Sequence, residues 1–307
     1  MTANGETLAV TAPAKINLYL AVLGKRPDGF HELLTVFQSL ALADRLTVQP
    51  GTAPGVVVRC DDERLPESEN LCTRAAHLLA AAAGHAPDDL PAVELQLEKR
   101  IPLGAGLGGG SSDAAATLRA LNAWWGLGVG DADLLRLAGA LGADVPYFLS
   151  LGTALATGRG DVIEPLEPLP PLWVVLAMPE EPVSTADAFA WWDEQQGVSQ
   201  PGAAGHDHFR TFQDFRARQM LRLLRAGALD GAAECCINDL EVPVTHYRPD
   251  IAVLIRQLRA AGCPLVRMTG AGAAVFGIAE TEADARAIAA RIDAPWVTVT
   301  HTGAPDG

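Results

Sequence analysis

The sequence predicts an α+β protein of two domains, and three observations lead to that prediction. The chain has 307 residues, which exceeds the size at which a single hydrophobic core usually stops growing. Its strand-like and helix-like segments mix without a strict strand–helix–strand rhythm, which favours two α+β sandwiches over one parallel sheet. A stretch rich in proline and turn residues, Gly158–Pro171, separates the two halves. We therefore expect domains at residues 1–164 and 165–307.

The N-terminal half is predicted to begin with strands and to continue with helices. Alternating apolar residues predict a strand over Ile16–Leu23, and three consecutive valines predict another within Gly55–Cys60. Alternation of Val93, Leu95 and Leu97 with polar residues predicts a third strand. The remaining elements expected in this half are three helices and a strand, at Asn70–Gly84, Ser111–Trp124, Asp131–Leu141 and Gly152–Thr157.

The C-terminal half is predicted to begin with a buried strand, Leu172–Met178. A polar segment rich in glycine and alanine, Gln195–His208, is expected to form a surface loop. Two short strands should pair around a glycine turn, Thr269–Gly272. The expected helices are Ala186–Glu194, Thr211–Ala226, Pro249–Ala261 and Glu282–Arg291, and the further strands are Leu265–Met268, Ala274–Ile278 and Trp296–Thr300.

A glycine-rich loop is the strongest functional signal in the chain. Residues Pro102–Ala114 read P-L-G-A-G-L-G-G-G-S-S-D-A, with five glycines in the seven positions 104–110. Glycine lets the backbone approach a bulky anion and turns successive N–H groups inward. A predicted strand precedes the loop and a predicted helix follows it, the arrangement that holds phosphate at a helix N-terminus. Ser111 and Ser112 are expected to cap that helix and can also contact a phosphate or its Mg²⁺. The loop predicts a nucleotide-using protein.

Two common glycine motifs do not explain this loop. Gly104-x-Gly106-x-x-Gly109 matches the dinucleotide fingerprint in form, but that fingerprint needs a strand soon after the helix. Here the helix leads through a Gly-Leu-Gly turn into a second helix, Asp131–Leu141. The P-loop of many nucleotide hydrolases needs a lysine directly after the glycines, where this chain has Ser111.

Composition narrows the class of partner. With 23 basic and 37 acidic residues the formal net charge is −14, which disfavours nucleic acid and anionic membranes as partners. The five cysteines form no C-x-x-C pair, so we expect free thiols in a reducing compartment, the cytoplasm. Neither a signal peptide nor an apolar run of membrane-spanning length is recognisable.

Several sequence blocks resemble one family. The glycine loop is similar to the phosphate loop of the GHMP kinases. Three further blocks are similar to the 4-diphosphocytidyl-2-C-methyl-D-erythritol kinases, a family within that group: Ala12–Leu18 (A-P-A-K-I-N-L), Arg26–His31 (R-P-D-G-F-H) and Leu141–Pro146 (L-G-A-D-V-P). Arg267–Phe276 resembles the family's C-terminal glycine turn.

This resemblance implies both a fold and an activity. The fold would combine an N-terminal domain like domain 2 of ribosomal protein S5 with a ferredoxin-like C-terminal domain, with the active site between them. The activity would be ATP-dependent phosphorylation, with Mg²⁺, of the 2-hydroxyl of 4-diphosphocytidyl-2-C-methyl-D-erythritol in non-mevalonate isoprenoid biosynthesis. The partner would be this small molecule, a polyol linked to cytidine diphosphate, and the protein would be a monomer or weak homodimer.

The resemblance also implies roles for individual residues. Lys15 and Asp144 match the catalytic pair, and Asn17 lies beside them. Phe30 and His31 match the aromatic–histidine pair that holds the cytosine. The second cytosine-stacking aromatic, aligned by its position after the Leu172–Met178 strand, is Phe189; with Asn17, Phe30, His31 and Asp144 it makes the substrate-binding set. The ATP-binding set is Pro102, Leu103, Gly104, Ala105, Gly106, Leu107, Gly108, Gly109, Gly110, Ser111, Ser112 and Asn70.

Each of these residues also has an ordinary structural interpretation. Lys15 fits an edge strand with its side chain in solvent. Asp144, at an expected helix-to-strand junction, fits a cap or turn, and His31 fits a packed turn. Phe189 fits the core, because a helix with neighbouring tryptophans must bury something. Asp113, in the first turn of a helix where a carboxylate is stabilising anyway, is not assigned to metal, and no metal ligand is predicted.

Three rival functions remain open at this point. The first is another small-alcohol kinase of the same group, specific for homoserine or mevalonate. The second is a decarboxylase of the diphosphomevalonate type, which would release CO₂. The third is a non-catalytic nucleotide-binding module, which would have no need for both Lys15 and Asp144.

Overall fold

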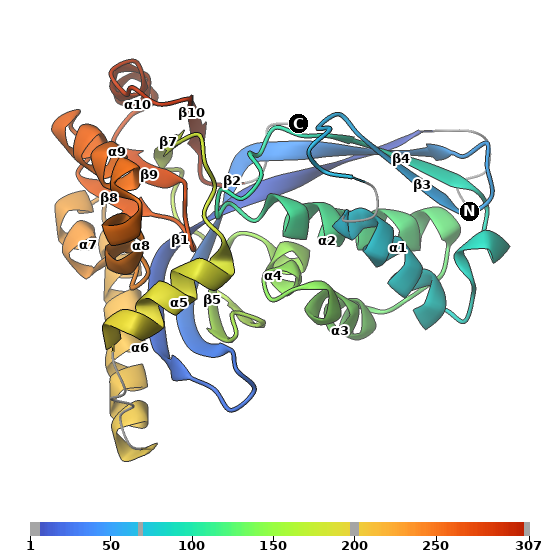
Figure 1. Ribbon diagram of the computed structural model, residues 1–307, viewed down its shortest axis with the longest axis horizontal. Coiled ribbons are helices and arrows are strands. Elements are labelled where there is room, and N and C mark those ends of the chain that lie inside the picture. The colour runs from blue at the N-terminus through green and yellow to red at the C-terminus, as the bar shows by residue number, and fades with distance from the viewer. Residues whose placement is uncertain (1–6, 67–69, 197–202, 304–307) are drawn as a thin grey trace.

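Two β-sheets, one in each half of the chain, organise the fold (Figure 1). The computed structural model describes residues 7–66, 70–196 and 203–303. The first sheet has the strand order β3-β4-β2-β5-β6, with β1 paired to β2, and the second has the order β10-β7-β9-β8. The first sheet comprises β1 (Leu8–Lys25), β2 (His31–Pro50), β3 (Val56–Cys60), β4 (Val93–Glu98), β5 (Thr153–Gly158) and β6 (Val162–Pro165). The second comprises β7 (Trp173–Met178), β8 (Leu265–Met268), β9 (Val275–Ala279) and β10 (Trp296–His301).

Helices cover one face of the first sheet, and further helices, including α9 and α10, lie beside the second (Figure 1). The buried faces of the helices in the first half are rich in alanine and leucine, which share one buried cluster with valine and leucine of β2 and β4. The helices of the first half are α1 (Leu71–Ala82), α2 (Gly109–Trp125), α3 (Asp131–Leu141) and α4 (Val145–Ser150), with a 3₁₀ turn at Pro87–Asp89. Those of the second half are α5 (Thr185–Gln196), α6 (Ala203–Arg225), α7 (Leu229–Cys235), α8 (Glu241–Tyr247), α9 (Pro249–Ala260) and α10 (Glu282–Ala289).

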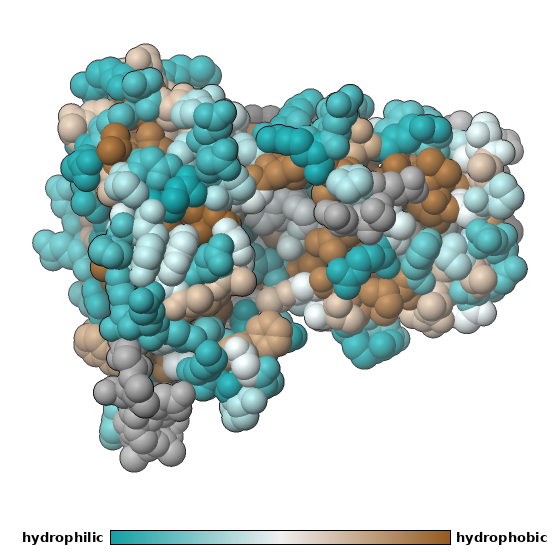
Figure 2. All heavy atoms as spheres, viewed as in Figure 1, coloured by the Kyte–Doolittle hydropathy of each residue, from teal (hydrophilic) through white to brown (hydrophobic). Residues whose placement is uncertain are grey.

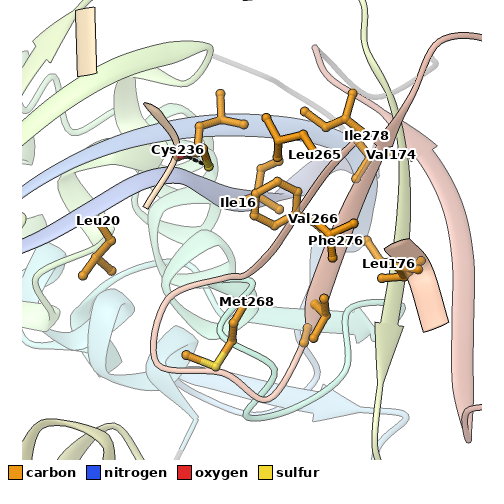
Figure 3. Close-up of a cluster of buried hydrophobic side chains, with 14 of the residues drawn as sticks. Ile16, Leu20, Val174, Leu176, Cys236, Leu265, Val266, Met268, Phe276 and Ile278 are labelled. Carbon is orange, nitrogen blue, oxygen red and sulfur yellow. Dashed lines mark hydrogen bonds between the residues drawn. The ribbon is translucent and has the colours of Figure 1, made fainter. Parts of the chain in front are cut away.

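The long β1–β2 hairpin belongs to both halves. Ile16 and Leu20 of β1 lie in the same buried cluster as Val174 and Phe276 of the second sheet (Figure 3). Leu20 also forms a parallel bridge with Asn238, which precedes α8. From Ala12 to Leu23 every residue of β1 is buried, so both faces of this part of the strand are covered, whereas an ordinary antiparallel strand often buries only one face.

Several elements differ from the sequence predictions. The β2 strand was not predicted, because it is buried on both faces along much of its length and so lacks the alternation of a half-exposed strand. The short helices α4, α7 and α8 were not predicted either. The expected junction segment contains β6, which pairs with β5. The boundary between residues 164 and 165 stays a prediction.

Three local predictions were wrong. Asp144 does not precede a strand: it is the N-cap residue of α4, which Val145 and Pro146 begin. Ser111 and Ser112 are not caps, because α2 begins two residues earlier and its N-cap is Gly108, in the left-handed region at φ +74°. The expected loop at Gln195–His208 is helical where it is described, at Gln195–Gln196 and from Ala203 onward; residues 197–202 lie outside the described part.

The surface and the thiols agree with the composition. Hydrophilic residues cover much of the C-terminal half in the view of Figure 2. All five cysteines are free thiols. No helix within the described ranges combines the length and the apolarity that crossing a membrane requires.

Candidate active site

A cleft of about 990 Å³ lies between the glycine loop, the β1–β2 hairpin and the second half of the chain. It brings together residues that are far apart in the sequence. The predicted site residues that line it are Lys15, Asn17, Phe30, His31, Asn70, Pro102, Leu103, Gly104, Ala105, Gly106, Gly108, Gly109, Gly110, Ser111, Asp144 and Phe189.

The glycine loop is held between β1 and the C-terminal glycine turn. The backbone N–H of Lys15 donates to the carbonyl of Leu107 at 2.9 Å, and that of Ala274 donates to the carbonyl of Ala105 at 3.0 Å. Gly106 adopts φ +76°, and a Cβ atom there would lie 2.4 Å from the carbonyl oxygen of Thr269. Only glycine fits this contact. The sequence therefore uses this glycine to bring two loops from different halves together.

The start of α2 supplies the backbone donors of the cleft. Gly109, Gly110 and Ser111 form its first turn and line the cleft. The first N–H groups of a helix have no intrahelical acceptor, and the positive end of the helix dipole lies there. This part of the cleft can therefore receive an anionic group such as a phosphate.

Two members of the predicted ATP-binding set, Leu107 and Ser112, lie away from the cleft, and a third, Asn70, lines it while capping a helix. Leu107 and Ser112 are both 1% exposed and do not line it; Ser112 lines a separate pocket on the other side of α2. Asn70 caps α1, with its Oδ1 accepting from the N–H of Cys72 at 2.9 Å. Its buried Nδ2 has no hydrogen-bond partner, so it can donate to a ligand in the cleft.

Lys15 and Asp144 form the charged pair of the site. The Lys15 Nζ lies 3.4 Å from the Asp144 Oδ2 and donates to the Asn17 Oδ1 at 2.8 Å. The lysine side chain is 4% exposed and that of Asp144 is 34% exposed, so the carboxylate remains accessible. Asp144 makes no side-chain capping bond to α4. Its carboxylate is therefore free to act in the cleft rather than being used by the helix.

A hydrogen-bonded network fixes Asn17 beside this pair. Its Nδ2 donates to the Thr35 Oγ1 at 2.8 Å, and its backbone N–H donates to the Thr269 Oγ1 at 3.0 Å. Thr35 in turn donates to the carbonyl of Tyr19 at 2.6 Å. All of these residues are buried, so the position of the Lys15 ammonium is set by the core.

Aromatic side chains line a different part of the cleft. His31 stacks on Phe189 with ring centroids 4.6 Å apart and an interplanar angle of 17°. Phe30 is 53% exposed, and the guanidinium of Arg159 lies 4.9 Å from its ring centroid. The His31 Nε2 lies 2.7 Å from the Asp193 Oδ1. Phe189 thus contacts His31 directly, and Phe30 and Phe189 both line the cleft.

Directly beneath the glycine loop lies a buried ionic cluster. Lys99 contacts Asp44, and its Nζ lies 2.6 Å from the Asp113 Oδ2. Asp44 also accepts from the backbone N–H of Ile101 at 2.8 Å. Burial, with the neighbouring Asp44 carboxylate, raises the pKa of Asp113 to about 7 against the opposing effect of Lys99. The Asp113 Oδ1 has no hydrogen-bond partner.

Sequence reasoning missed several residues of this site. Thr269 was identified only as part of the glycine turn, and Arg159 and Asp193 carried no signal because each lies in an ordinary polar segment. Lys99 lies just before the glycine loop, in the segment E-K-R, and this position could have marked it as a candidate site residue. Lys99, Arg159 and Asp193 line the cleft, and Thr269 contacts Asn17 beside it. Tertiary packing brings them there, which spacing in the sequence does not reveal.

The chain matches the GHMP kinases N terminal domain over residues 70–152 and the GHMP kinases C terminal domain over residues 216–298. A 4-diphosphocytidyl-2-C-methyl-D-erythritol kinase of Pelotomaculum thermopropionicum is 42% identical over 285 residues, covering 92% of this chain and 93% of that protein. Another, of Moorella thermoacetica, is 40% identical over 300 residues, covering 97% and 99%.

The chain belongs to the 4-diphosphocytidyl-2-C-methyl-D-erythritol kinase family. A crystal structure of a 4-(cytidine 5'-diphospho)-2C-methyl-D-erythritol kinase superposes with a TM-score of 0.77 at 36% identity and covers 96% of this chain. A homoserine kinase of Cytophaga hutchinsonii superposes at 0.72 but is 19% identical, and so shares the fold alone. The predicted two-domain α+β fold of the GHMP kinases is confirmed, and the protein is an ATP-dependent small-molecule kinase of that superfamily.

Proposed function

We propose that this member of the 4-diphosphocytidyl-2-C-methyl-D-erythritol kinase family transfers the γ-phosphoryl group of ATP to the 2-hydroxyl of 4-diphosphocytidyl-2-C-methyl-D-erythritol. The product is the 2-phosphate, an intermediate of the non-mevalonate route to isoprenoids. The observation that carries the proposal is the Lys15–Asp144 pair, 3.4 Å apart in a cleft that also holds the glycine loop. Identity of 40–42% over nearly the whole chain supports the choice of acceptor.

The nucleotide binds through the loop at the start of α2. The backbone N–H groups of Gly109, Gly110 and Ser111 hold phosphate oxygens, because these donors lie at a helix N-terminus and lack intrahelical partners. The unpaired Nδ2 of Asn70 offers a donor to the base or ribose of the nucleotide. The contact between Gly106 and Thr269 keeps the loop in place while the phosphates are bound.

Asp144 acts as the general base. An alcohol is a poor nucleophile unless a base removes its proton as the new bond forms, and Asp144 offers an accessible carboxylate for the 2-hydroxyl proton. The hydroxyl oxygen bonds to the γ-phosphorus, and the bond from that phosphorus to the β-phosphate oxygen breaks, which releases ADP. Lys15 offsets negative charge on the carboxylate and the moving phosphoryl group. Asn17 holds the Lys15 ammonium in position.

The cytidine end of the acceptor binds among the aromatic residues. The cytosine stacks on Phe30 and Phe189, and His31 forms hydrogen bonds with its edge. Stacking of a base on an aromatic ring contributes about 1–3 kcal/mol. Phe30 is suited to this role because its exposed ring is already held by Arg159.

The carboxylates of the cleft fit a magnesium ion that arrives with ATP. Mg²⁺ is usually held by one or two carboxylates together with substrate phosphates, and neutralises phosphate charge. Near the glycine loop, Asp144 offers an accessible carboxylate, and the buried Oδ1 of Asp113 is unpaired. Within the described residues no group of three or more His, Cys, Asp or Glu side chains is placed to hold a metal by itself.

A coupled ADP-release assay tests the proposed function. With Mg²⁺-ATP, we expect turnover with 4-diphosphocytidyl-2-C-methyl-D-erythritol and none with homoserine, mevalonate or cytidine-free polyols. Turnover of diphosphomevalonate with release of CO₂ would instead identify a decarboxylase, and ATP binding without ADP release would identify a binding module. The same proposal places the protein in the cytoplasm as a monomer or weak homodimer.

A further inference from the structure

A carboxylate outside the predicted site residues contacts the histidine of the cytosine end. Asp193 lies on α5, one helical turn after Phe189, and its Oδ1 is 2.7 Å from the His31 Nε2. Its Oδ2 accepts from the Lys25 Nζ at 2.6 Å. Lys25 and His31 face each other across the β1–β2 pairing, so one carboxylate joins α5 to both strands of the hairpin.

The surroundings hold the imidazole of His31 in one orientation. His31 is 8% exposed. One face of its ring stacks on Phe189 at 4.6 Å, and Trp192 contacts it edge-on at 5.5 Å with an interplanar angle of 85°. With the ring plane fixed by these contacts, the remaining freedom of the imidazole is which nitrogen carries the proton.

Asp193 removes that freedom. Burial opposes ionisation of Asp193, but the hydrogen bonds from Lys25 and His31 outweigh it and hold the pKa of this carboxyl below its usual range. An ionised carboxylate can only accept hydrogen bonds, so the Nε2 of His31 must carry a proton. In a neutral imidazole the other nitrogen, Nδ1, is then an acceptor.

We propose that Asp193 is a positioning residue that fixes the Nε2–H tautomer of His31 and thereby makes the site selective for cytosine over uracil. The inference rests on the proposed function, in which His31 contacts the edge of the base. An acceptor at Nδ1 complements the exocyclic amino group of cytosine, which donates. The same acceptor disfavours uracil, which carries a carbonyl oxygen at this position, because two acceptors would then face each other with no proton between them.

The isosteric variant Asp193→Asn tests this role. Asparagine has a single side-chain acceptor, and the charged Lys25 ammonium competes for it more strongly than a neutral imidazole does. The amide N–H then faces the His31 Nε2, which must accept, and the proton moves to Nδ1. The matched control is Glu194→Gln on the next residue of the helix, whose carboxylate accepts from the Tyr247 hydroxyl at 2.7 Å outside the cleft.

Two measurements decide the proposal. Imidazole ¹⁵N NMR of the free protein, with the His31 signal assigned by His31→Gln, should show the Nε2–H tautomer in wild type and Glu194→Gln and the Nδ1–H tautomer in Asp193→Asn. The ratio of kcat/KM for the cytidine substrate to that for its uridine analogue should fall about tenfold in Asp193→Asn, equivalent to about 1.4 kcal/mol. The KM for ATP should not change.

Each other outcome overturns a distinct statement. An unchanged tautomer in Asp193→Asn overturns the positioning role, and a changed tautomer with an unchanged substrate ratio overturns the link to base selection. If the wild-type protein turns over neither substrate, the proposed function fails, while the NMR result on the free protein still decides whether Asp193 sets the tautomer.

Discussion

At the scale of single residues, the position of Lys15 determines what Asp144 can do. The lysine is almost fully buried and is held by Asn17, whereas the carboxylate is one-third exposed. A fixed cation beside an accessible base is suited to a reaction in which a proton leaves and negative charge moves. We therefore expect the two side chains to work as one unit, so that their separate contributions do not add.

We expect Lys15→Ala and Asp144→Ala each to lower kcat by about 10²–10⁴, the range for a positioned acid–base group, and the double variant to be little worse. Steady-state kinetics, with binding of both ligands followed by calorimetry, would measure this. Near-normal kcat in Asp144→Asn would contradict proton abstraction by this residue and would favour the γ-phosphate itself as the base.

The pKa of Asp113 leads to a prediction on stability. Because this pKa is raised from 3.8 to about 7, the folded protein keeps a proton that the unfolded chain has lost between about pH 4 and pH 7. The free energy of unfolding should therefore decrease as pH rises through this window, by at most about 1.4 kcal/mol per pH unit from this group. Asp113→Asn should remove that contribution. Urea unfolding at several pH values would measure it, and parallel curves for the two proteins would contradict it.

At the scale of elements, we propose that the glycine loop and α2 form one phosphate-binding unit, but its glycines are not equivalent. A Cβ at Gly108 would lie 2.7 Å from the ring of Phe148, so a substitution there disturbs the core as well as the cleft. A Cβ at Gly110 would meet only the Leu71 side chain, at 3.8 Å. A substitution at Gly110 therefore tests ligand access to the cleft without disturbing the packing of the core.

We expect Gly110→Ala to weaken ATP binding by about tenfold or more, because a methyl group would project over the N–H groups that hold the phosphates. Stability should be kept or slightly increased, since alanine favours the helix by about 0.5–1 kcal/mol. The control is Gly139→Ala in α3, where a Cβ meets nothing within 4 Å. Gly139→Ala should raise stability by a similar amount without changing the affinity for ATP. Wild-type ATP affinity in Gly110→Ala would show that the phosphates bind elsewhere.

The elements also show where prediction from sequence succeeds. Amphipathic helices such as Asp131–Leu141 and the alternating strand at Val93–Glu98 were predicted because each exposes one face and so keeps a periodic pattern. The sequence of β2 shows no alternation of apolar and polar residues, because both faces of the strand are buried along much of its length. The start of α2 was misplaced, since a left-handed glycine cap outweighs the serines that usually mark a helix start.

In the candidate site, the residues in local sequence blocks could be predicted, but their distant partners could not. The loop and the lysine block could be recognised from local residue patterns. The partners that orient the site residues, such as Thr35, Thr269 and Asp193, come from other strands, helices and turns, and their distances of 18 to 252 residues along the chain leave no local signal. Leu107 and Ser112 shared the loop's sequence pattern, but their side chains turn away from the cleft into packed surroundings.

At the scale of the whole molecule, the two halves share structure and cannot be regarded as independent. The β1 strand contributes Ile16 and Leu20 to the buried cluster of the second sheet, and the N–H of Ala274 bonds to the glycine loop of the first half. Separating the halves would expose this shared apolar surface to water. We therefore expect one cooperative unfolding transition.

Calorimetry should show a single peak whose calorimetric and van't Hoff enthalpies agree. Fragments 1–164 and 165–307 expressed separately should be unfolded or aggregated. Two resolved transitions, or two folded fragments, would contradict the shared core.

The common cleft also has a consequence for the order of events in catalysis. The glycine loop and the His31–Phe189 pair line the same cavity of about 990 Å³, at the upper end of the range for small-molecule sites, so donor and acceptor can be present together. Direct transfer then needs no covalent phosphoryl-enzyme, and initial-velocity double-reciprocal plots should intersect. Parallel lines would reveal that ADP leaves before the acceptor arrives and that a side chain carries the phosphoryl group in between.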